Sequence, residues 1–486
     1  MNRLSRPRGP VASALLLCLL AAPAAAQEAA KGGKVKKPAA PARDGRVVPA
    51  VVPGRPLIIS EFRLNGTAGQ NDEFIEIYNA SDAPHTVNSS DGSNTGYGVA
   101  ASDGTLRFTI PQNTVIPARG HYLGCNSVGY SLAALPSGNN GQSATTATCD
   151  ATWTTNIPNG EDPDGAGPNP PLPRRGIALF STAVAANFNT NTRLDAVGPT
   201  EEANMLYKEG TGVRNLMPLP SAHSYVRRLP GGCIGTSPSD VDSNCASFTS
   251  VISTAPPSSV HPQDTDNNRD DFIFVDAQGT NLNAEGGLMR RLGAPGPQNS
   301  TSPIDRSANI KSSLVFPCAG AHESPNTVRV IPPEPGAPPQ TQGTFEIRRR
   351  WTNRTGGSIS RLRFRIVDIS TFPAGVYVLP APPNDNCGAP GAQCAADLRA
   401  ITSTDSLEAN PVACGGGTIT IRGTTLEQAA GNEAQPSGGG FNSTLSAGTV
   451  TLGTQLANGA SVDVRFLLGV QQVGAYRFFV VVEALP

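Results

Sequence analysis

The chain has 486 residues, with 52 glycines and 44 prolines, and only 15% of its residues are charged. This composition is rich in turns and lacks the charge excess of a disordered chain, so it excludes long helical bundles and coiled coils. A formal net charge of −1 at pH 7 argues against a general nucleic-acid-binding protein, and we expect no intracellular nucleic-acid partner.

The first 26 residues have the pattern of a secretory signal peptide. Three arginines precede an apolar run from Val11 to Ala22, and Ala24-Ala25-Ala26 offers the small residues at which signal peptidase cuts. The run is too short to span a bilayer, and no later stretch of about 18 apolar residues follows it. We therefore predict a protein secreted to the periplasm, cell surface or medium, with no transmembrane segment once the signal is removed.

Segment 27–56 is rich in alanine, lysine and proline and predicts a disordered basic linker. From Leu57 onward, short β-branched or aromatic runs alternate with connections rich in glycine, proline and asparagine, and no run has a sustained helical period. Strands are predicted at Leu57 to Phe62, Glu73 to Tyr78, Leu106 to Ile110, His121 to Cys125, Gly176 to Phe180, Leu194 to Val197, Ala222 to Arg227 and Phe272 to Asp276.

The pattern breaks near residue 300, in a stretch of glycine, proline and serine that we interpret as a domain boundary. Beyond it, strands are predicted at Arg361 to Val367, Thr418 to Arg422, Val462 to Leu468 and Tyr476 to Glu483. The predicted fold class is all-β, with two immunoglobulin-like β-sandwich domains and long loops, over 57–300 and 301–486.

The first strand pair resembles the opening of the lamin tail domain. The resemblance rests on Ile58-Ile59-Ser60-Glu61-Phe62, the turn Asn65-Gly66 and the run from Asp72 to Asn79, and it extends with looser matches to Gly198. It implies an immunoglobulin-like sandwich without an active site, of the type found on exported and cell-surface bacterial proteins. The expected partner is then an extracellular or envelope protein or polysaccharide.

Eight cysteines remain after the predicted signal peptide, an even number for a chain bound for an oxidising compartment. Pairing of nearest neighbours favours Cys125 with Cys149 and Cys233 with Cys245, although eight cysteines allow 105 connectivities. The same scheme pairs Cys387 with Cys394 and leaves Cys318 with Cys414. Their spacing is not that of a zinc site.

One polar cluster has oxygen ligands of the kind that calcium prefers: Asp264, Asp266, Asn268 and Asp270, followed by Asp271. The glycine and the closing glutamate of an EF-hand are both missing, because Arg269 and Val275 stand at those positions. A turn that leads into the next strand is the favoured interpretation. Apart from a calcium ion at this loop, we expect no cofactor.

No motif predicts catalysis. Paired carboxylates of the kind a hydrolase uses could come from Glu61, Asp72, Glu73 and Glu76. Cross-strand hydrogen bonding is favoured instead, because Glu61 and Glu76 lie in strands that the resemblance makes structural. The sequence has no GxSxG, HExxH or GxxxxGK(S/T) motif. We expect a protein that is not an enzyme.

Arginines are concentrated between Phe345 and Arg365, and Arg361, Arg363 and Arg365 alternate with the apolar residues of a predicted strand. Guanidinium groups on one face suit an anionic ligand, and a solvated face that prevents edge pairing is the favoured alternative.

The sequence thus predicts an exported, non-catalytic interaction or adhesion module. The alternatives are a secreted hydrolase whose active site lies in the inserted loops, and a structural spacer of the cell envelope.

Overall fold

The computed structural model describes residues 56–133, 145–159, 174–213, 222–227, 262–277, 290–307, 309–332, 336, 340–371, 396–428, 439–448, 452–472, 476 and 478–486. All of these residues belong to one compact unit that spans 48–486. The predicted signal peptide and the linker up to residue 55 lie outside the described residues, as do Cys233, Cys245, Cys387 and Cys394.

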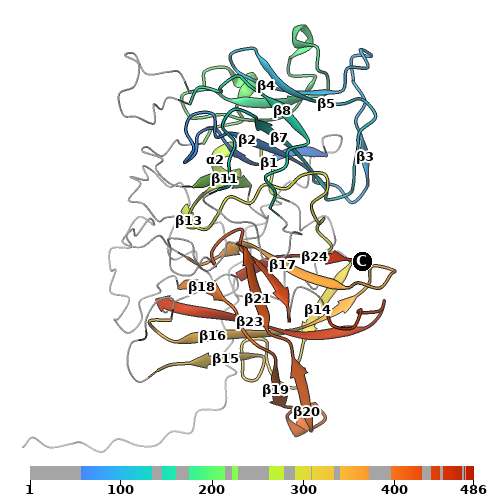
Figure 1. Ribbon diagram of the computed structural model, residues 1–486, viewed down its shortest axis with the longest axis vertical. Helices are drawn as coiled ribbons and strands as arrows, with labels where there is room; N and C mark the ends of the chain where they lie inside the picture. Colours follow the sequence, from blue (N-terminus) through green and yellow to red (C-terminus); the bar gives the residue numbers. More distant parts are fainter. Residues whose placement is uncertain are drawn as a thin grey trace, which may run out of the picture. The chain divides into compact units, whose positions relative to one another are not determined.

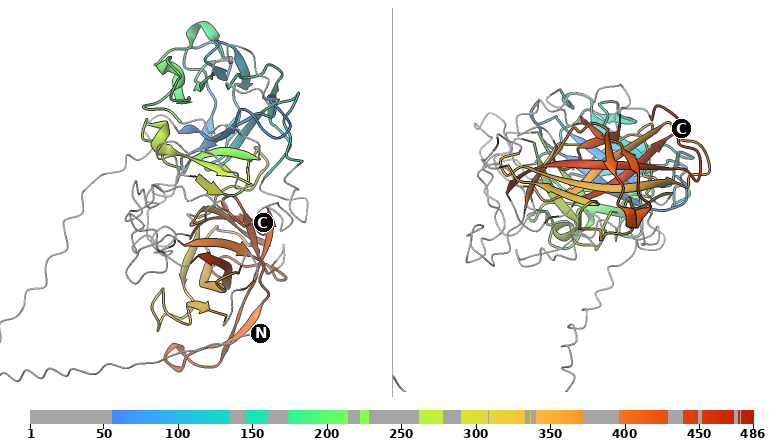
Figure 2. Two further views of the ribbon diagram at one scale, coloured as in Figure 1. Left: turned by 90° about the vertical axis from the view of Figure 1, so that its left-hand side faces the viewer. Right: turned by 90° about the horizontal axis from the view of Figure 1, so that it is seen from below.

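Strands are the main secondary structure of the described chain, with a few short helical turns (Figures 1 and 2). The one α-helical turn among the described residues is α2 (Asn268–Asp271), and 3-10 turns occur at Ala185–Asn187, Met205–Tyr207 and Val412–Cys414. No helix in the described part is long and apolar enough to cross a membrane. The all-β fold class predicted from the sequence is confirmed.

The strands before residue 300 form two main sheets. One is a seven-stranded sheet in the order β13-β12-β11-β1-β2-β7-β8, and the other is a four-stranded sheet in the order β10-β9-β4-β5. The seven strands are β13 (Arg290–Leu292), β12 (Phe272–Asp276), β11 (His223–Arg227), β1 (Leu57–Arg63), β2 (Phe74–Asn79), β7 (His121–Asn126) and β8 (Ala151–Trp153). The four strands are β10 (Arg193–Val197), β9 (Ile177–Phe180), β4 (Tyr97–Ala101) and β5 (Leu106–Ile110), and β3 (His85–Thr86) pairs with β6 (Val115–Ile116).

These two sheets pack face to face around one apolar core. Ile59, Ile75 and Ile77 from the larger sheet and Val99 and Leu179 from the smaller one are fully buried in the same cluster. Alternating apolar residues in β1 and β2 place one face of each strand in this core, as a sandwich requires.

The strands after residue 300 form a second pair of sheets. The first has the order β14-β16-β23-β18 with β15 also paired to β16, and the second has the order β21-β22-β17-β24. Their bounds are β14 (Ile310–Leu314), β15 (Thr327–Val330), β16 (Thr344–Asn353), β23 (Ser461–Gln472), β18 (Asp397–Ile401), β21 (Thr424–Gln428), β22 (Thr444–Ala447), β17 (Arg361–Ile369) and β24 (Phe478–Leu485). A separate hairpin joins β19 (Ser406–Ala409) to β20 (Thr418–Ile421).

The core of this second sandwich is built around aromatic residues. Trp351 and Phe466 from one sheet meet Phe364 from the other, and the Phe364 and Phe466 rings lie 4.9 Å apart at 90°. Each of the main described sheets draws its strands from one side of residue 300 only. The division into two independent domains stays a prediction.

Candidate functional site

A β-bulge places two of the four candidate acids, Glu61 and Glu76, side by side on the outer face of the first sheet. Leu57 and Ile59 of β1 face the core, and the register with β2 shifts between Ile59 and Glu61, so that Phe62 also faces the core while Glu61 faces outward. Glu61 then lies directly opposite Glu76 of β2. Both side chains are buried, with 1% and 3% of their surface exposed.

Glu61 is held by hydrogen bonds from four separate segments of the chain. Its Oε1 accepts from Ser224 Oγ at 2.6 Å and from the Gly296 backbone N–H at 2.8 Å. Its Oε2 lies 3.5 Å from Arg365 Nη2 and 3.4 Å from Asn442 Nδ2.

Glu76 has its own set of partners. Ser60 Oγ donates to its Oε1 at 2.5 Å, and the Gln298 backbone N–H donates to its Oε2 at 2.6 Å. His121 Nδ1 lies 3.2 Å from Oε1, which is ion-pair distance but lacks the angle of a hydrogen bond. The two acids therefore tie strands β1, β2 and β7 to the segment around residue 297 and to β17.

A cavity of about 70 Å³ adjoins the pair, lined by Glu61, Glu76, His121, Arg365 and Glu483 among other residues. This volume holds several water molecules, since one needs roughly 10 to 15 Å³. Val367 and Phe441 also border the cavity, and most of its lining surface is apolar.

The environment separates the pKa values of the two acids. Burial, with the nearby charge of Glu76, raises the pKa of Glu61 to about 7. Burial alone would also raise the pKa of Glu76, but the charge and proximity of His121, with Arg365 and Ser60, lower it. Below about pH 7, Glu61 is therefore the acid that retains a proton, while Glu76 is ionised.

The alternation predicted for β17 is confirmed, because Leu362, Phe364 and Ile366 are buried in the core of the second sandwich. The expectation of an open arginine face is wrong. Arg361, Arg363 and Arg365 are at least 94% buried, with exposed fractions of 2%, 0% and 6%.

Carboxylates cover this arginine face. Glu427 of β21 accepts from Arg361 Nη2 at 3.1 Å and from Arg363 Nε at 3.0 Å. Glu483 of β24 stands directly opposite Arg363 and lies 3.6 Å from its Nη1. Together with Arg365 and Glu61, these residues form what we call the β17 cluster, with three arginines against three glutamates: Arg361, Arg363, Arg365, Glu61, Glu427 and Glu483.

The four residues of the predicted calcium loop have different environments. Asp264 and Asn268 are buried, whereas Asp266 and Asp270 are exposed. The Asn268 side chain accepts from the backbone N–H groups of Gly198 and Glu209 and donates to the carbonyl of Ala196. Asn268 therefore anchors the loop, and a calcium ion held by this four-residue set stays a prediction.

A second buried ionic cluster surrounds Arg227, at the end of β11. Its Nη2 donates to both carboxylate oxygens of Asp195 at 2.7 Å, and its Nη1 lies 3.4 Å from both Asp264 and Asp271. Glu209 adjoins these acids, and its Oε1 lies 3.5 Å from Arg193 Nη2. We call this group the Arg227 cluster: Arg193, Asp195, Glu209, Arg227, Asp264 and Asp271.

Sequence reasoning missed this cluster, although one signal was present. Asp195 and Arg227 are charged residues within strands whose other members are mostly buried. Charged residues in such strands indicate buried ion pairs, but their 32-residue separation gave no reason to pair them.

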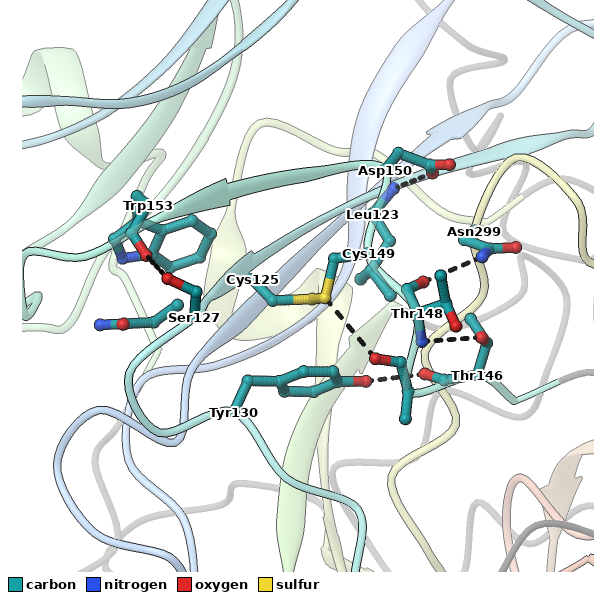
Figure 3. Close-up of a disulfide and its surroundings, with 12 residues drawn as sticks. Leu123, Cys125, Ser127, Tyr130, Thr146, Thr148, Cys149, Asp150, Trp153 and Asn299 are labelled. Atoms are coloured by element: carbon teal, nitrogen blue, oxygen red, sulfur yellow. Dashed lines mark hydrogen bonds between the residues drawn. A yellow bond between two sulfur atoms is a disulfide. The ribbon is translucent and has the colours of Figure 1, made fainter.

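Two disulfides are present among the described residues, and both match the predicted pairing. Cys125 joins Cys149, and Cys318 joins Cys414. Around the first bond, Tyr130 donates to the Thr146 carbonyl and Asn299 donates to the Thr148 carbonyl (Figure 3). The disulfides are compatible with a secreted protein.

The second disulfide holds the tip of the β19–β20 hairpin. Val412, in the 3-10 turn beside Cys414, is 92% exposed, and Leu407 on β19 is 70% exposed. The hairpin thus presents apolar side chains to solvent on a covalently anchored support.

No protein-family model matches the sequence, and no curated protein matches it. Among solved structures, the chain is similar to a DUF4876 family protein from Bacteroides thetaiotaomicron, at 14% sequence identity and a TM-score of 0.26. The match covers 45% of this chain and 70% of that chain. A TM-score this low carries no argument about fold or function, so the resemblance to the lamin tail domain stays an expectation from the sequence.

Proposed function

We propose that this is an exported, non-catalytic protein of the lamin-tail type that binds an envelope or extracellular partner. One observation carries the proposal: the charged residues that the sequence offers for chemistry are buried and bonded to one another. Glu61 and Arg365 contact each other across two sheets, and Arg361 and Arg363 share Glu427. Groups used in this way hold the protein together and are poorly placed to meet a polymeric substrate or ligand.

The disulfides and the exposed hairpin tip add support. Disulfides persist in oxidising compartments, which agrees with the predicted signal peptide. A rigid apolar tip binds at a low cost in conformational entropy, because the bound geometry already exists in the free protein. We therefore expect Val412 and Leu407 to contact the partner.

The test is retention of the mature chain, 27–486, on the envelope fraction of the producing cell, with separate protein and polysaccharide arms at low and high salt. We expect retention in one arm that persists at high salt, since the described arginines of β17 are not free to contribute. Val412→Asp should weaken retention, and Val115→Asp, at a site 57% exposed on β6, is the matched control. If the chain is retained in neither arm, the binding role is refuted and the alternative function, a structural spacer of the envelope, is favoured.

A second candidate function is hydrolysis, which the cavity beside Glu61 and Glu76 favours. Two carboxyls whose pKa values are driven apart are the groups that acid and base catalysis needs. The inserted loops where the sequence placed such a site, 129–173 and 210–255, lie largely outside the described residues. The test is hydrolysis of an envelope polymer by the wild-type chain. If Glu61→Gln and Glu76→Gln each fold and each lose this activity, hydrolysis is established as the function instead.

A further inference from the structure

The Arg227 cluster contains more negative charge than its arginines oppose. Four carboxylates (Asp195, Glu209, Asp264 and Asp271) stand against two guanidinium groups (Arg193 and Arg227), which leaves two negative charges. All four carboxylate residues are at least 92% buried. Uncompensated charge in such a place is costly, so buried charges are normally paired or bound to a metal ion.

Glu209 is the acid of the cluster with the fewest contacts to positive charge or hydrogen-bond donors among the described residues. Its Oε2 is buried and has no hydrogen-bond partner among the residues that the structure describes. Its Oε1 lies at 3.5 Å from Arg193, a long contact, and only 3% of the side chain is exposed. Oε2 is thus a strong acceptor with no donor in the part of the chain described.

The neighbouring oxygens are spaced as ligands of a single ion. Asp195, Glu209 and Asp264 each offer one carboxylate oxygen, and these oxygens lie within 4.8 Å of one another. Calcium binds oxygen at about 2.3 to 2.6 Å, so two ligands of one ion are at most about twice that distance apart. Asp195 is fixed in place, because the backbone N–H groups of Ile59 and Ala196 donate to it.

We propose that Asp195, Glu209 and Asp264 bind one calcium ion. The ligands are all carboxylate oxygens, which suit a hard cation, and calcium tolerates the irregular coordination that residues from three separate segments provide. Its two positive charges equal the charge that the arginines leave uncompensated.

Arg227 does not by itself neutralise these three carboxylates. It bonds closely to Asp195 at 2.7 Å, but it is 3.4 Å from Asp264 and leaves Glu209 Oε2 without a donor. The competing occupant is a proton, since burial and the charges of Asp195 and Asp264 raise the pKa of Glu209 to about 10. The inference is independent of the binding role proposed above.

The test is calorimetric and thermal titration of the full mature chain with CaCl₂ at pH 8, after dialysis against a chelator. We expect one ion per chain and a rise in melting temperature of about 2 to 5 °C in 10 mM calcium. Magnesium should give a smaller rise, because it demands a regular octahedron.

Two pairs of variants locate the ion. Glu209→Gln and Asp264→Asn should each weaken calcium affinity at least tenfold and abolish the thermal shift. Asp266→Asn and Asp270→Asn, which alter exposed acids of the same loop, should leave both unchanged. Circular dichroism checks that each variant folds. Because the two substitutions alter different ligands, the test still stands if one of the two variants fails to fold.

Two results would overturn the proposal. The first is no heat and no thermal shift in the wild-type chain at 10 mM calcium, which would leave the proton as the occupant. The second is a shift that persists in Glu209→Gln and disappears in Asp266→Asn or Asp270→Asn, which would move the ion to the exposed loop.

Discussion

Two buried ionic clusters in this protein differ in one respect, the balance of their charges. In the β17 cluster three arginines face three glutamates, and Glu427 alone accepts from two of the arginines. In the Arg227 cluster four carboxylates face two arginines, which leaves two negative charges. The comparison shows that burial of charged residues alone does not indicate a binding site, whereas burial with an excess of negative charge favours the binding of a cation.

The largest effect should come from Arg227→Met. The change leaves Asp195, Asp264 and Asp271 without their shared guanidinium, and breaking a buried pair in this way costs about 3 to 5 kcal/mol. Unfolding in urea, or loss of soluble protein, measures it. Arg422→Met removes a pair whose side chains are 48% and 40% exposed, and it should cost less than about 1 kcal/mol. Equal losses in the two variants would contradict the role given to Arg227.

A smaller but still large effect is expected for Glu427→Gln in the β17 cluster. The substitution keeps the shape but removes the charge that Arg361 and Arg363 share, so it should cost about 3 kcal/mol. Asp405→Asn, in the exposed pair with Arg422, is the control. A cost below about 1 kcal/mol would mean that the balance of the cluster does not matter to stability.

The pH dependence of stability tests Glu61. Its pKa in the folded protein is about 7, above the ordinary value of 4.5, so the unfolded chain loses this proton first and stability falls as pH rises from 4.5 to 7. The fall from Glu61 is about 3 kcal/mol in this window. Burial also raises the pKa of Glu73 to about 7, of Asp195 to about 6 and of Glu209 to about 10, so Glu61→Gln should remove about a quarter of the slope measured by urea unfolding. An unchanged slope would show that Glu61 is ionised throughout.

The smallest effect is expected at the exposed acids of the α2 loop. Asp270→Asn removes a charge from a side chain that accepts from Asn267 at the surface, and the stability should change by less than about 0.5 kcal/mol. A larger loss of stability, measured by thermal unfolding, would mean that the charges important for stability lie in this exposed loop and not in the Arg227 cluster.

Much of the fold could be predicted because local patterns determine it. The strands predicted from Leu57 to Phe62 and from Glu73 to Tyr78 are β1 and β2, and they pair as expected. β16 was missed because Arg348, Arg349 and Arg350 interrupt the alternation of apolar residues. Two of their partners are distant in the sequence, since Arg350 pairs with Asp463 on β23 and Arg348 with Glu408 on β19, although Arg348 also pairs with nearby Glu346.

The buried ionic clusters were harder to predict, because their ion pairs join residues that are far apart in the sequence. The alternation of β17 indicated two faces, but no pattern in the sequence indicated that Glu427 and Glu483 cover the polar face. Ion pairs between residues as far apart as Glu61 and Arg365 depend on tertiary packing. Composition and periodicity describe neighbours along a strand and do not describe contacts between sheets.

The most direct test compares Glu427→Gln with Glu209→Gln by urea unfolding at pH 8 in a chelator. The two substitutions are chemically identical and both sites are buried. We predict opposite behaviour: Glu427→Gln is destabilised by about 3 kcal/mol. Glu209→Gln is unchanged or more stable, because Glu209, with its pKa raised to about 10, must take up a proton when the chain folds at pH 8, and glutamine need not. Similar destabilisation of both variants would contradict the distinction between a balanced structural cluster and an unbalanced cation site.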